Sequence, residues 1–223
     1  MTAAGAALAL FLGAALQSAT GFGFALVSAP ILFALLGPQE AVTAGVLVAL
    51  VPNTLTLAGE RRRPQVLGRE TLALLAWSLP GLALGAVALR ALSHRGRRRP
   101  AAAPSRPWYL PLAGVSSGAM STATSLNGPP LVFYLLARGA GRAQTRDTLA
   151  AIFLVHAVLG VPALLLSGAF TMPDAIWALL LAALAGQLLG RRAFGWLRGE
   201  RYEPAVYAVL VATALVAVIA AFA

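Results

Sequence analysis

Long apolar stretches, separated by short polar segments, run through almost the whole chain. They cover about residues 2–36, 40–59, 69–92, 107–137, 148–170, 173–190 and 204–223. A helix needs roughly 20 apolar residues to cross the hydrocarbon core of a bilayer, and most of the stretches have about this length. The pattern therefore predicts an all-α integral membrane protein with about seven apolar segments, in a single polytopic domain over residues 1–223.

Two of these stretches, 2–36 and 107–137, are too long for one plain span. Each is interrupted near its middle by a cluster of Gly, Ser, Thr, Asn and Pro. Residues 16–30 read LQSATGFGFALVSAP, and residues 116–130, which lie 100 positions later, read SSGAMSTATSLNGPP. Each interrupted stretch fits either one discontinuous helix that crosses once or two short helices folded back as a hairpin.

The duplication extends to the segments that follow the clusters. Val51-Pro52 is matched by Val161-Pro162, and a Gly-x-x-x-Gly pattern at Gly81 and Gly85 is matched at Gly186 and Gly190. Small residues at this spacing allow close contact between helices. We therefore expect two related repeats of inverted orientation, each with a broken helix that faces the substrate. The expected parts are repeat one at 1–92, a basic linker at 93–107, and repeat two at 108–223 with an additional C-terminal span.

Composition supports the membrane class. The chain is 59% hydrophobic, its mean hydropathy is +0.81, and only 11% of its residues are charged. The net charge of +10 comes from 17 basic residues, all arginine. Because these arginines flank the apolar stretches, positive-inside anchoring explains them better than binding to nucleic acid. The chain has no cysteine, which excludes disulfides and thiolate metal sites.

The arginines give conflicting signals for membrane topology. Loops 60–69 and 93–106 carry four and five arginines, yet one apolar stretch separates them. If each broken segment crosses once, loops 60–69, 138–147 and 191–203 are cytoplasmic and 93–106 is the exception. If each is a hairpin, loop 60–69 becomes the exception.

The two clusters predict a site for a small anion. Gly21 and Gly23 permit backbone conformations that other residues resist, and a proline after Gly128 begins a helix cleanly. A helix that begins there directs N–H groups and a partial positive charge toward the substrate. No carboxylate lies in the middle of a span to bind a cation, and no metal or cofactor is expected. The expected substrate-binding residues of the clusters are Gln17, Ser18, Thr20, Gly21, Gly23, Ser116, Ser117, Ser121, Thr122, Thr124, Asn127, Gly128 and Pro129.

Three further polar residues, Asn53, His156 and Gln187, lie inside other apolar stretches. His156 is a candidate substrate ligand or proton carrier, and Asn53 and Gln187 are candidates to complete the site. Each has a structural alternative, since a buried His or amide also serves as an interhelical hydrogen bond. Likewise, Ser and Thr occur widely at helix contacts, although their clustering here favours a role in binding.

Two other function classes must be considered. Gly114-Val115-Ser116-Ser117-Gly118 fits Gly-x-Ser-x-Gly, and with His156 it is compatible with an intramembrane serine protease dyad. The chain is also compatible with a non-catalytic membrane subunit of a larger complex. The duplicated broken segments favour a carrier over an enzyme, because a protease needs one site whereas alternating access uses two related halves.

The chain resembles the sulfite exporter TauE/SafE family, also called the 4-toluene sulfonate uptake permease family. The resemblance is carried by GFGFALVSAP, by SLNGPPLVFYLL and by the basic segment GRRAFGWL after the second Gly-x-x-x-Gly helix. It implies a multi-pass carrier of the cell inner membrane for sulfite, sulfonates or related organic acids. The expected partners are this anion and the lipid bilayer, nucleic acid is not expected, and a homodimer is one assembly that the sequence leaves open.

Overall fold

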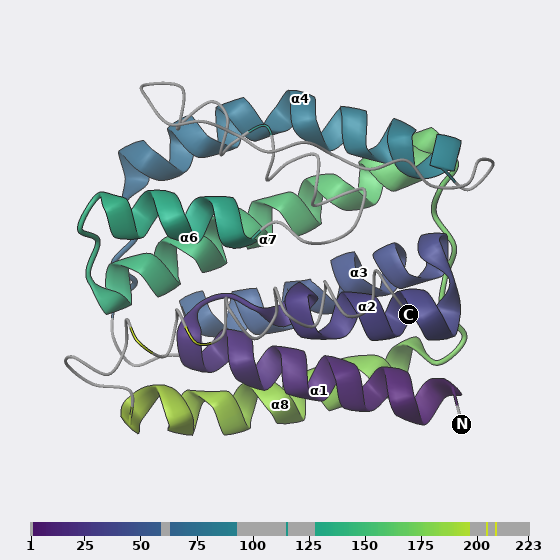
Figure 1. Ribbon diagram of the computed structural model, residues 1–223, viewed down its shortest axis with the longest axis horizontal. Coiled ribbons are helices and arrows are strands. Elements are labelled where there is room, and N and C mark those ends of the chain that lie inside the picture. Colours follow the sequence, from purple (N-terminus) through teal and green to yellow (C-terminus); the bar gives the residue numbers. More distant parts are fainter. Residues whose placement is uncertain are drawn as a thin grey trace.

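The computed structural model describes residues 2–58, 63–92, 115, 128–196, 204 and 208. These residues form helices joined by short turns, without a strand among them, as expected for an all-α protein. The helices lie side by side with their axes along one common direction (Figure 1). They are α1 (Thr2–Thr20), α2 (Phe24–Leu36), α3 (Pro38–Ala58), α4 (Gly68–Leu92), α6 (Gly128–Ala137), α7 (Arg142–Ser167) and α8 (Ile176–Trp196).

Four of the described helices, α1, α3, α7 and α8, are long and apolar enough to cross a membrane. Large apolar side chains also face outward, and Leu166, Trp177 and Leu72 are 89%, 77% and 71% exposed. Such a surface is costly in water but suits contact with lipid. These helices confirm the prediction of a multi-pass membrane protein. The predicted span 204–223 and most of the second broken segment lie outside the described residues.

The first broken segment is a hairpin. Gly21 and Gly23 both have positive φ angles, 96° and 98°, and the chain reverses between them. A Cβ on Gly13 would lie 2.6 Å from the carbonyl oxygen of Phe24, and one on Gly5 would lie 3.0 Å from the side chain of Leu35. The two helices α1 and α2 therefore run antiparallel in close contact, which decides between the two alternatives for this segment.

Three connections gather at one end of the bundle, on the left in Figure 1. The backbone N–H of Gln65, between α3 and α4, donates to Oδ2 of Asp147 at 2.7 Å, and that of Leu67 donates to Oγ1 of Thr148 at 3.0 Å. Asp147 and Thr148 lie in the second turn of α7. The guanidinium of Arg142, in the first turn of α7, donates to the carbonyl oxygen of Phe194 near the end of α8 at 3.0 Å.

This end of the bundle is rich in arginine, and we call it the arginine-rich end. The opposite end holds the α2–α3 and α7–α8 turns with Glu40 and Asp174, and Arg90 in the last turn of α4 is its one arginine among the described residues. Charge therefore separates clearly between the two ends. The described arginines at or near the arginine-rich end are Arg63, Arg69, Arg138, Arg142, Arg146, Arg191 and Arg192.

The described helices differ from both topologies that the sequence leaves open. The first broken segment returns to the end of the bundle from which it started, because α2 runs back along α1. Helix α4 begins at the arginine-rich end and ends away from it, whereas α6 finishes at it (Figure 1), so the turns on either side of α4 and α6 place loops 60–69 and 138–147 at the same end. Both uniform topologies expected from the sequence are therefore wrong. Loops 60–69, 138–147 and 191–203 nevertheless adjoin the same end. The topology in which each broken segment crosses once required this.

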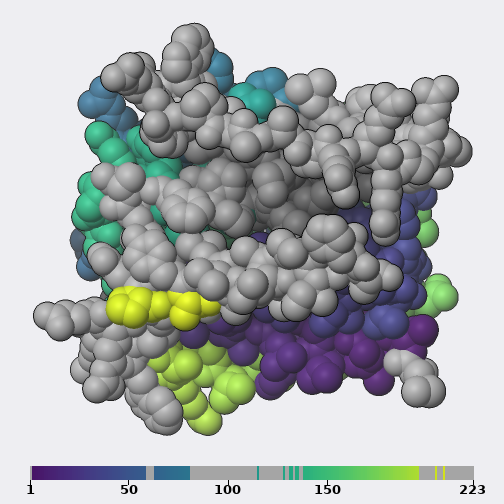
Figure 2. Space-filling model, in the orientation of Figure 1, coloured from purple at the N-terminus to yellow at the C-terminus, as the bar shows by residue number. Residues whose placement is uncertain are grey.

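Glycine allows α8 to pack directly on α1. A Cβ on Gly186 or Gly190 would collide with the carbonyl oxygen of Phe11 or Ala15, respectively, so neither position admits a side chain at this separation. The pair confirms that the second Gly-x-x-x-Gly pattern brings two helices together. Figure 2 shows the two helices, purple and yellow-green, along the lower edge of the molecule.

Candidate functional site

The two short helices α2 and α6 both begin in the interior of the bundle. The first residue of α2 lies beside Gly13. Gly13 is about 17 Å from the start of α1, at a rise of about 1.5 Å per residue. At the start of α6, a Cβ on Gly128 would lie 3.6 Å from Cβ of Phe22 and 3.7 Å from Cζ of Phe153. Phe153 is also about 17 Å from the start of its own helix, α7. Both N-termini therefore meet near Phe22, and their helices leave in opposite directions (Figure 1).

The bend between α1 and α2 is held by Thr20. Its hydroxyl lies 2.9 Å from the carbonyl oxygens of both Leu16 and Phe22, one of which accepts its proton. The ring of Phe22 is fully buried in a cluster with Leu74, Leu131 and Ile152. The bend is thus packed into the core, where the backbone turns at Gly21 and Gly23.

Polar side chains expected at the site join α1 and α8 to α3. The amide of Gln17 donates to Oδ1 of Asn53 at 2.6 Å, and Asn53 donates to the carbonyl oxygen of Ala49 at 2.7 Å. The amide of Gln187 donates to Oγ1 of Thr56 at 3.0 Å and to the carbonyl oxygen of Pro52 at 3.2 Å. Asn53 and Gln187 therefore make interhelical hydrogen bonds, the structural role that the sequence allowed for them. Their role in substrate binding stays a prediction.

Two polar atoms of this buried cluster lack a hydrogen bond in the described part of the chain. Oγ of Ser18 and Oε1 of Gln187 are buried and make no hydrogen bond among the described residues. Ser18 faces α8, because a Cβ on Gly190 would lie 2.7 Å from Cβ of Ser18. An unsatisfied buried hydroxyl is costly unless a water or a ligand completes its bonds.

The imidazole of His156 lies 2.8 Å from the hydroxyl of Ser78 on α4. The hydroxyl of Ser78 also lies 2.8 Å from the carbonyl oxygen of Leu75, and the tautomer of His156 decides which of the two neighbours receives the single proton of Ser78. This bond joins α7 to α4 and gives no support to a dyad with Ser116. Outside the described residues lie Ser116, Ser117, Ser121, Thr122, Thr124 and Asn127; Pro129 lies in the first turn of α6.

One buried residue was missed by the sequence reasoning. Arg146 has no exposed surface, and its guanidinium lies 4.0 Å from the ring centroid of Phe194. Arg142, one turn earlier, lies 4.2 Å from the same centroid. In the sequence, both resemble ordinary flanking arginines of a loop. Arg142 and Arg146 are four residues apart, so they lie on one face of a helix. This spacing is the sequence signal from which a contact with one common side chain could have been predicted.

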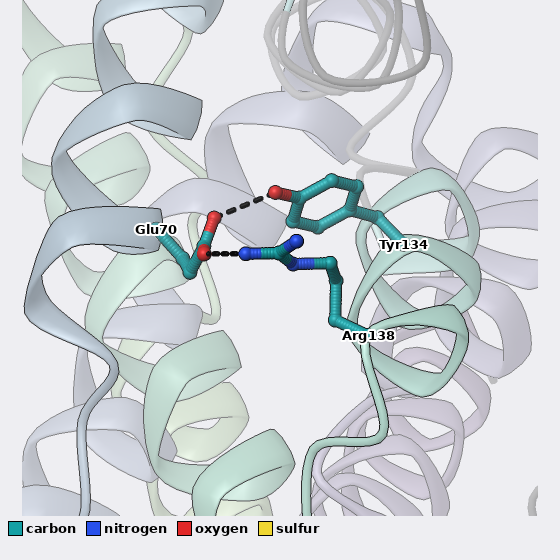
Figure 3. Close-up of polar contacts among 3 residues, drawn as sticks. All are labelled: Glu70, Tyr134 and Arg138. Carbon is teal, nitrogen blue, oxygen red and sulfur yellow. Dashed lines mark hydrogen bonds and ion pairs between the residues drawn. The ribbon is translucent and has the colours of Figure 1, made fainter. Parts of the chain in front are cut away.

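A polar contact fastens α6 to α4 at the arginine-rich end (Figure 3). Glu70, in the first turn of α4, accepts from the hydroxyl of Tyr134 at 2.6 Å and from the guanidinium of Arg138 at 2.7 Å. The hydrogen bond to Glu70 raises the pKa of Arg138, which lies beyond the end of α6, so this side chain stays charged. The contact links two segments that belong to different expected repeats.

A pocket of about 280 Å³ lies at the opposite end of the bundle, lined by residues that include Thr2, Glu40, Asp174 and Leu179. Its two carboxylates disfavour an anion, so the pocket is not the predicted site. Among the described residues no group of His, Asp and Glu could hold a metal ion.

Comparison with known proteins gives one result. No curated protein and no solved structure matches the chain. A family model described as sulfite exporter TauE/SafE matches residues 6–97 and 93–217, which together take in most of the sequence and both broken segments. The resemblance carried by the Gly-rich segments is thereby confirmed, and the chain belongs to the sulfite exporter TauE/SafE family of membrane transporters.

Proposed function

We propose that the protein carries a small oxyanion of sulfur, sulfite or a sulfonate, across the cell inner membrane. The observation that carries the proposal is the meeting of the α2 and α6 N-termini at Phe22. The first N–H groups of a helix have no partner within it and bear a partial positive charge. Two such ends directed at one place, deep in an apolar bundle, favour a negatively charged ligand.

The helix directions support two inverted repeats. Helices α3 and α7 run antiparallel, since Thr43 contacts Thr171 at 3.3 Å while Val46 lies beside Gly160. Helices α2 and α6 also run in opposite directions, as do α4 and α8 (Figure 1). Contacts between the halves correspond as well: α8 bonds to α3 through Gln187, and α4 bonds to α7 through His156. We propose that movement of one part of the bundle against the rest exposes the site alternately to the two sides.

Transport by the purified chain in proteoliposomes tests this function. We expect saturable uptake of labelled sulfite or methanesulfonate without any partner protein, measured with and without a pH gradient. Asn127→Leu removes a polar donor next to the start of α6 and should reduce uptake at least about tenfold, the scale of one lost hydrogen bond to a charged ligand. Ser167→Ala is the matched control, because this hydroxyl donates to the carbonyl oxygen of Leu164 in its own helix.

Other outcomes distinguish the remaining function classes. An inactive purified chain that becomes active with a co-purified protein would identify a subunit of a larger complex. Cleavage of a reporter peptide by the purified chain, abolished by Ser116→Ala, would identify a protease, since the acyl intermediate needs that nucleophile. A carrier should lose only one hydroxyl among many in the same variant and keep measurable uptake.

We also propose that the arginine-rich end faces the cytoplasm, because positively charged loops are retained there. The chain has no cysteine, so single cysteines can be introduced without further changes. Gln65→Cys at the arginine-rich end and Asp174→Cys at the opposite end both place the thiol at an exposed position. A membrane-impermeant maleimide added to intact cells should label Asp174→Cys alone. Labelling of Gln65→Cys alone would reverse the orientation.

A further inference from the structure

Helices α7 and α8 are fastened together at the arginine-rich end. Nη1 of Arg142 donates to the carbonyl oxygen of Phe194 at 3.0 Å, and the guanidinium carbons of Arg142 and Arg146 lie 4.2 Å and 4.0 Å from the centroid of its ring. A guanidinium over an aromatic ring is a favourable cation–π contact. We call these three residues the clasp. At the opposite end the chain itself connects the helices, between Ser167 and Ile176 (Figure 1), so α7 and α8 can separate only where the clasp holds them.

Helix α8 is joined firmly to α1 and α3. Gly186 and Gly190 bring its backbone against α1, and the amide of Gln187 donates to Oγ1 of Thr56 on α3 at 3.0 Å. The amide of Gln17 joins α1 to α3 as well. Helices α1, α3 and α8 therefore form one group, whereas α7 packs on α3, α4 and α6.

The contact between this group and α7 is made by α3 and is apolar. Val42 and Val46 of α3 pack in one cluster with Ala157 and Leu164 of α7, and a Cβ on Gly160 would lie 3.3 Å from Val46. In the part of the chain that the structure describes, α3 makes no hydrogen bond to α7 itself. Packed helices slide past each other by small amounts in shear movements, and here no directional bond between α3 and α7 opposes such a movement.

The clasp lies between the proposed site and the arginine-rich end. Phe153, which contacts the start of α6, follows Arg146 on α7 by roughly 10 Å of helix. The bend before α2 also lies against α7 at this level, because a Cβ on Gly21 would lie 2.8 Å from Cα of Arg146. A movement that parts the clasp therefore takes place directly beside the N-termini at which the anion is proposed to bind.

We propose that the clasp is the gate of the arginine-rich end. It closes that end in this structure, and the end opens when α8, together with α1 and α3, moves away from the start of α7 along the apolar α3–α7 contact. The assignment rests on the proposed function, since alternating access needs a barrier on each side of the site. Arg142 is partly exposed, so water can take over its hydrogen bond when the helix ends part, which keeps the cost of opening small.

Two buried alanines on one face of α7 can report opening at different depths. Ala150 lies about one turn beyond Arg146 and Ala157 about two turns further, and they are 2% and 3% exposed. The chain has no cysteine, so Ala150→Cys and Ala157→Cys can each be introduced alone. The rate of modification by 2-hydroxyethyl methanethiosulfonate, a small uncharged reagent, is then measured on the purified full chain in detergent. This measurement does not depend on transport.

Weakening the clasp should speed the modification of Ala150→Cys. Phe194→Leu removes the ring and keeps an apolar side chain, and it should raise the rate at least about fivefold, the effect of losing one cation–π contact of ordinary strength. Arg142→Gln should raise the rate by a similar factor, since it removes the donor to the Phe194 carbonyl oxygen. Arg192→Gln is the matched control, because Arg192 is exposed and lies outside the clasp on the same helix. It should change the rate by less than about twofold, as for other surface substitutions.

The deeper position distinguishes a gate from a general loosening of the bundle. Ala157→Cys should keep its slow rate in both clasp variants. Faster modification of both cysteines would overturn the assignment and leave the clasp as a structural tie, and an unchanged rate at Ala150→Cys would also overturn it. If one clasp variant is not recovered from membranes, the other decides, because each removes a different part of the clasp. Absence of uptake by the unmodified chain would overturn the proposed function, whereas faster modification of Ala150→Cys alone would still show that the clasp closes this end.

Discussion

Helices α8 and α4 occupy corresponding places in the two expected repeats, yet they are attached to the bundle in different ways. Helix α8 presents the small residues Ala183, Gly186 and Gly190 to α1, so that the backbones touch. Helix α4 presents Leu74 and Ser78 to α7, and the contact depends on side chains and on the bond to His156. Both helices expose apolar side chains on their other faces, including Trp177 on α8.

The difference shows how one bundle can combine a fixed and an adjustable contact. Backbone contact through glycine leaves no side chain to rotate, so α8 cannot shift on α1 without opening a void or a collision. A contact made by a serine hydroxyl and an imidazole can re-form in another geometry. We therefore expect α1 and α8 to move as one body in the proposed transport cycle, and α4 to move relative to α7.

The largest effect should follow from breaking the glycine contact. In Gly190→Leu the new side chain collides with the carbonyl oxygen of Ala15 and with Ser18, so the helices must separate. We expect a loss of about 3 kcal/mol or more in unfolding free energy, at the upper end for overpacked cores. Unfolding in mixed detergent, followed by tryptophan fluorescence, measures the change.

The same helix provides the control. A Cβ on Gly195 meets nothing within 4 Å, so Gly195→Ala should leave stability within about 1 kcal/mol of the original or raise it slightly. If both substitutions have equal effects, the small residues of α8 contribute through helix propensity alone, and α8 is no more firmly fixed than α4.

Much of this arrangement could be predicted from the chain. The apolar stretches indicated the helices, Gly21 and Gly23 marked the first bend, and the Gly186 and Gly190 pair marked a close helix contact. These features are local, because a glycine in an apolar stretch commonly serves either a positive φ or a close approach of two backbones. Local signals of this kind depend little on the rest of the fold, so the structure retains them.

What the sequence could not provide depends on how distant segments meet. A hairpin and a discontinuous helix have the same apolar pattern, so only contacts within the segment, of Gly13 with Phe24 and of Gly5 with Leu35, distinguish them. Arg146 carries the same charge as the arginines that flank spans, and its burial follows from the place that Gly21 takes beside α7. Similarly, Asp147 gave no sign that it would receive the N–H of Gln65.

A smaller effect should follow from removing the polar bond of α4. Ser78→Ala deletes the hydrogen-bond partner of Nε2 of His156 inside the bundle. We expect a loss of about 1 kcal/mol, since interhelical hydrogen bonds in membrane proteins are worth about that amount or less. Ser167→Ala, whose hydroxyl bonds within its own helix, should have almost no effect in the same assay. A loss as large as that of Gly190→Leu would mean that α4 is fixed as firmly as α8.

The smallest effect concerns the exposed end of α4, where Glu70 meets Arg138. The side chain of Arg138 is 59% exposed and that of Glu70 18%, so water and salt screen the ion pair. A double-mutant cycle with Glu70→Gln and Arg138→Gln should give a coupling of at most about 1 kcal/mol, and the coupling should shrink in about 0.5 M salt, where screening becomes strong. Tyr134→Phe removes the other donor to Glu70 and leaves the ion pair in place, so it serves as the matched variant. A coupling of about 3 kcal/mol that persists in salt would be in the range of a buried ion pair. It would show that this contact joins the two halves more firmly than the glycine contact of α8.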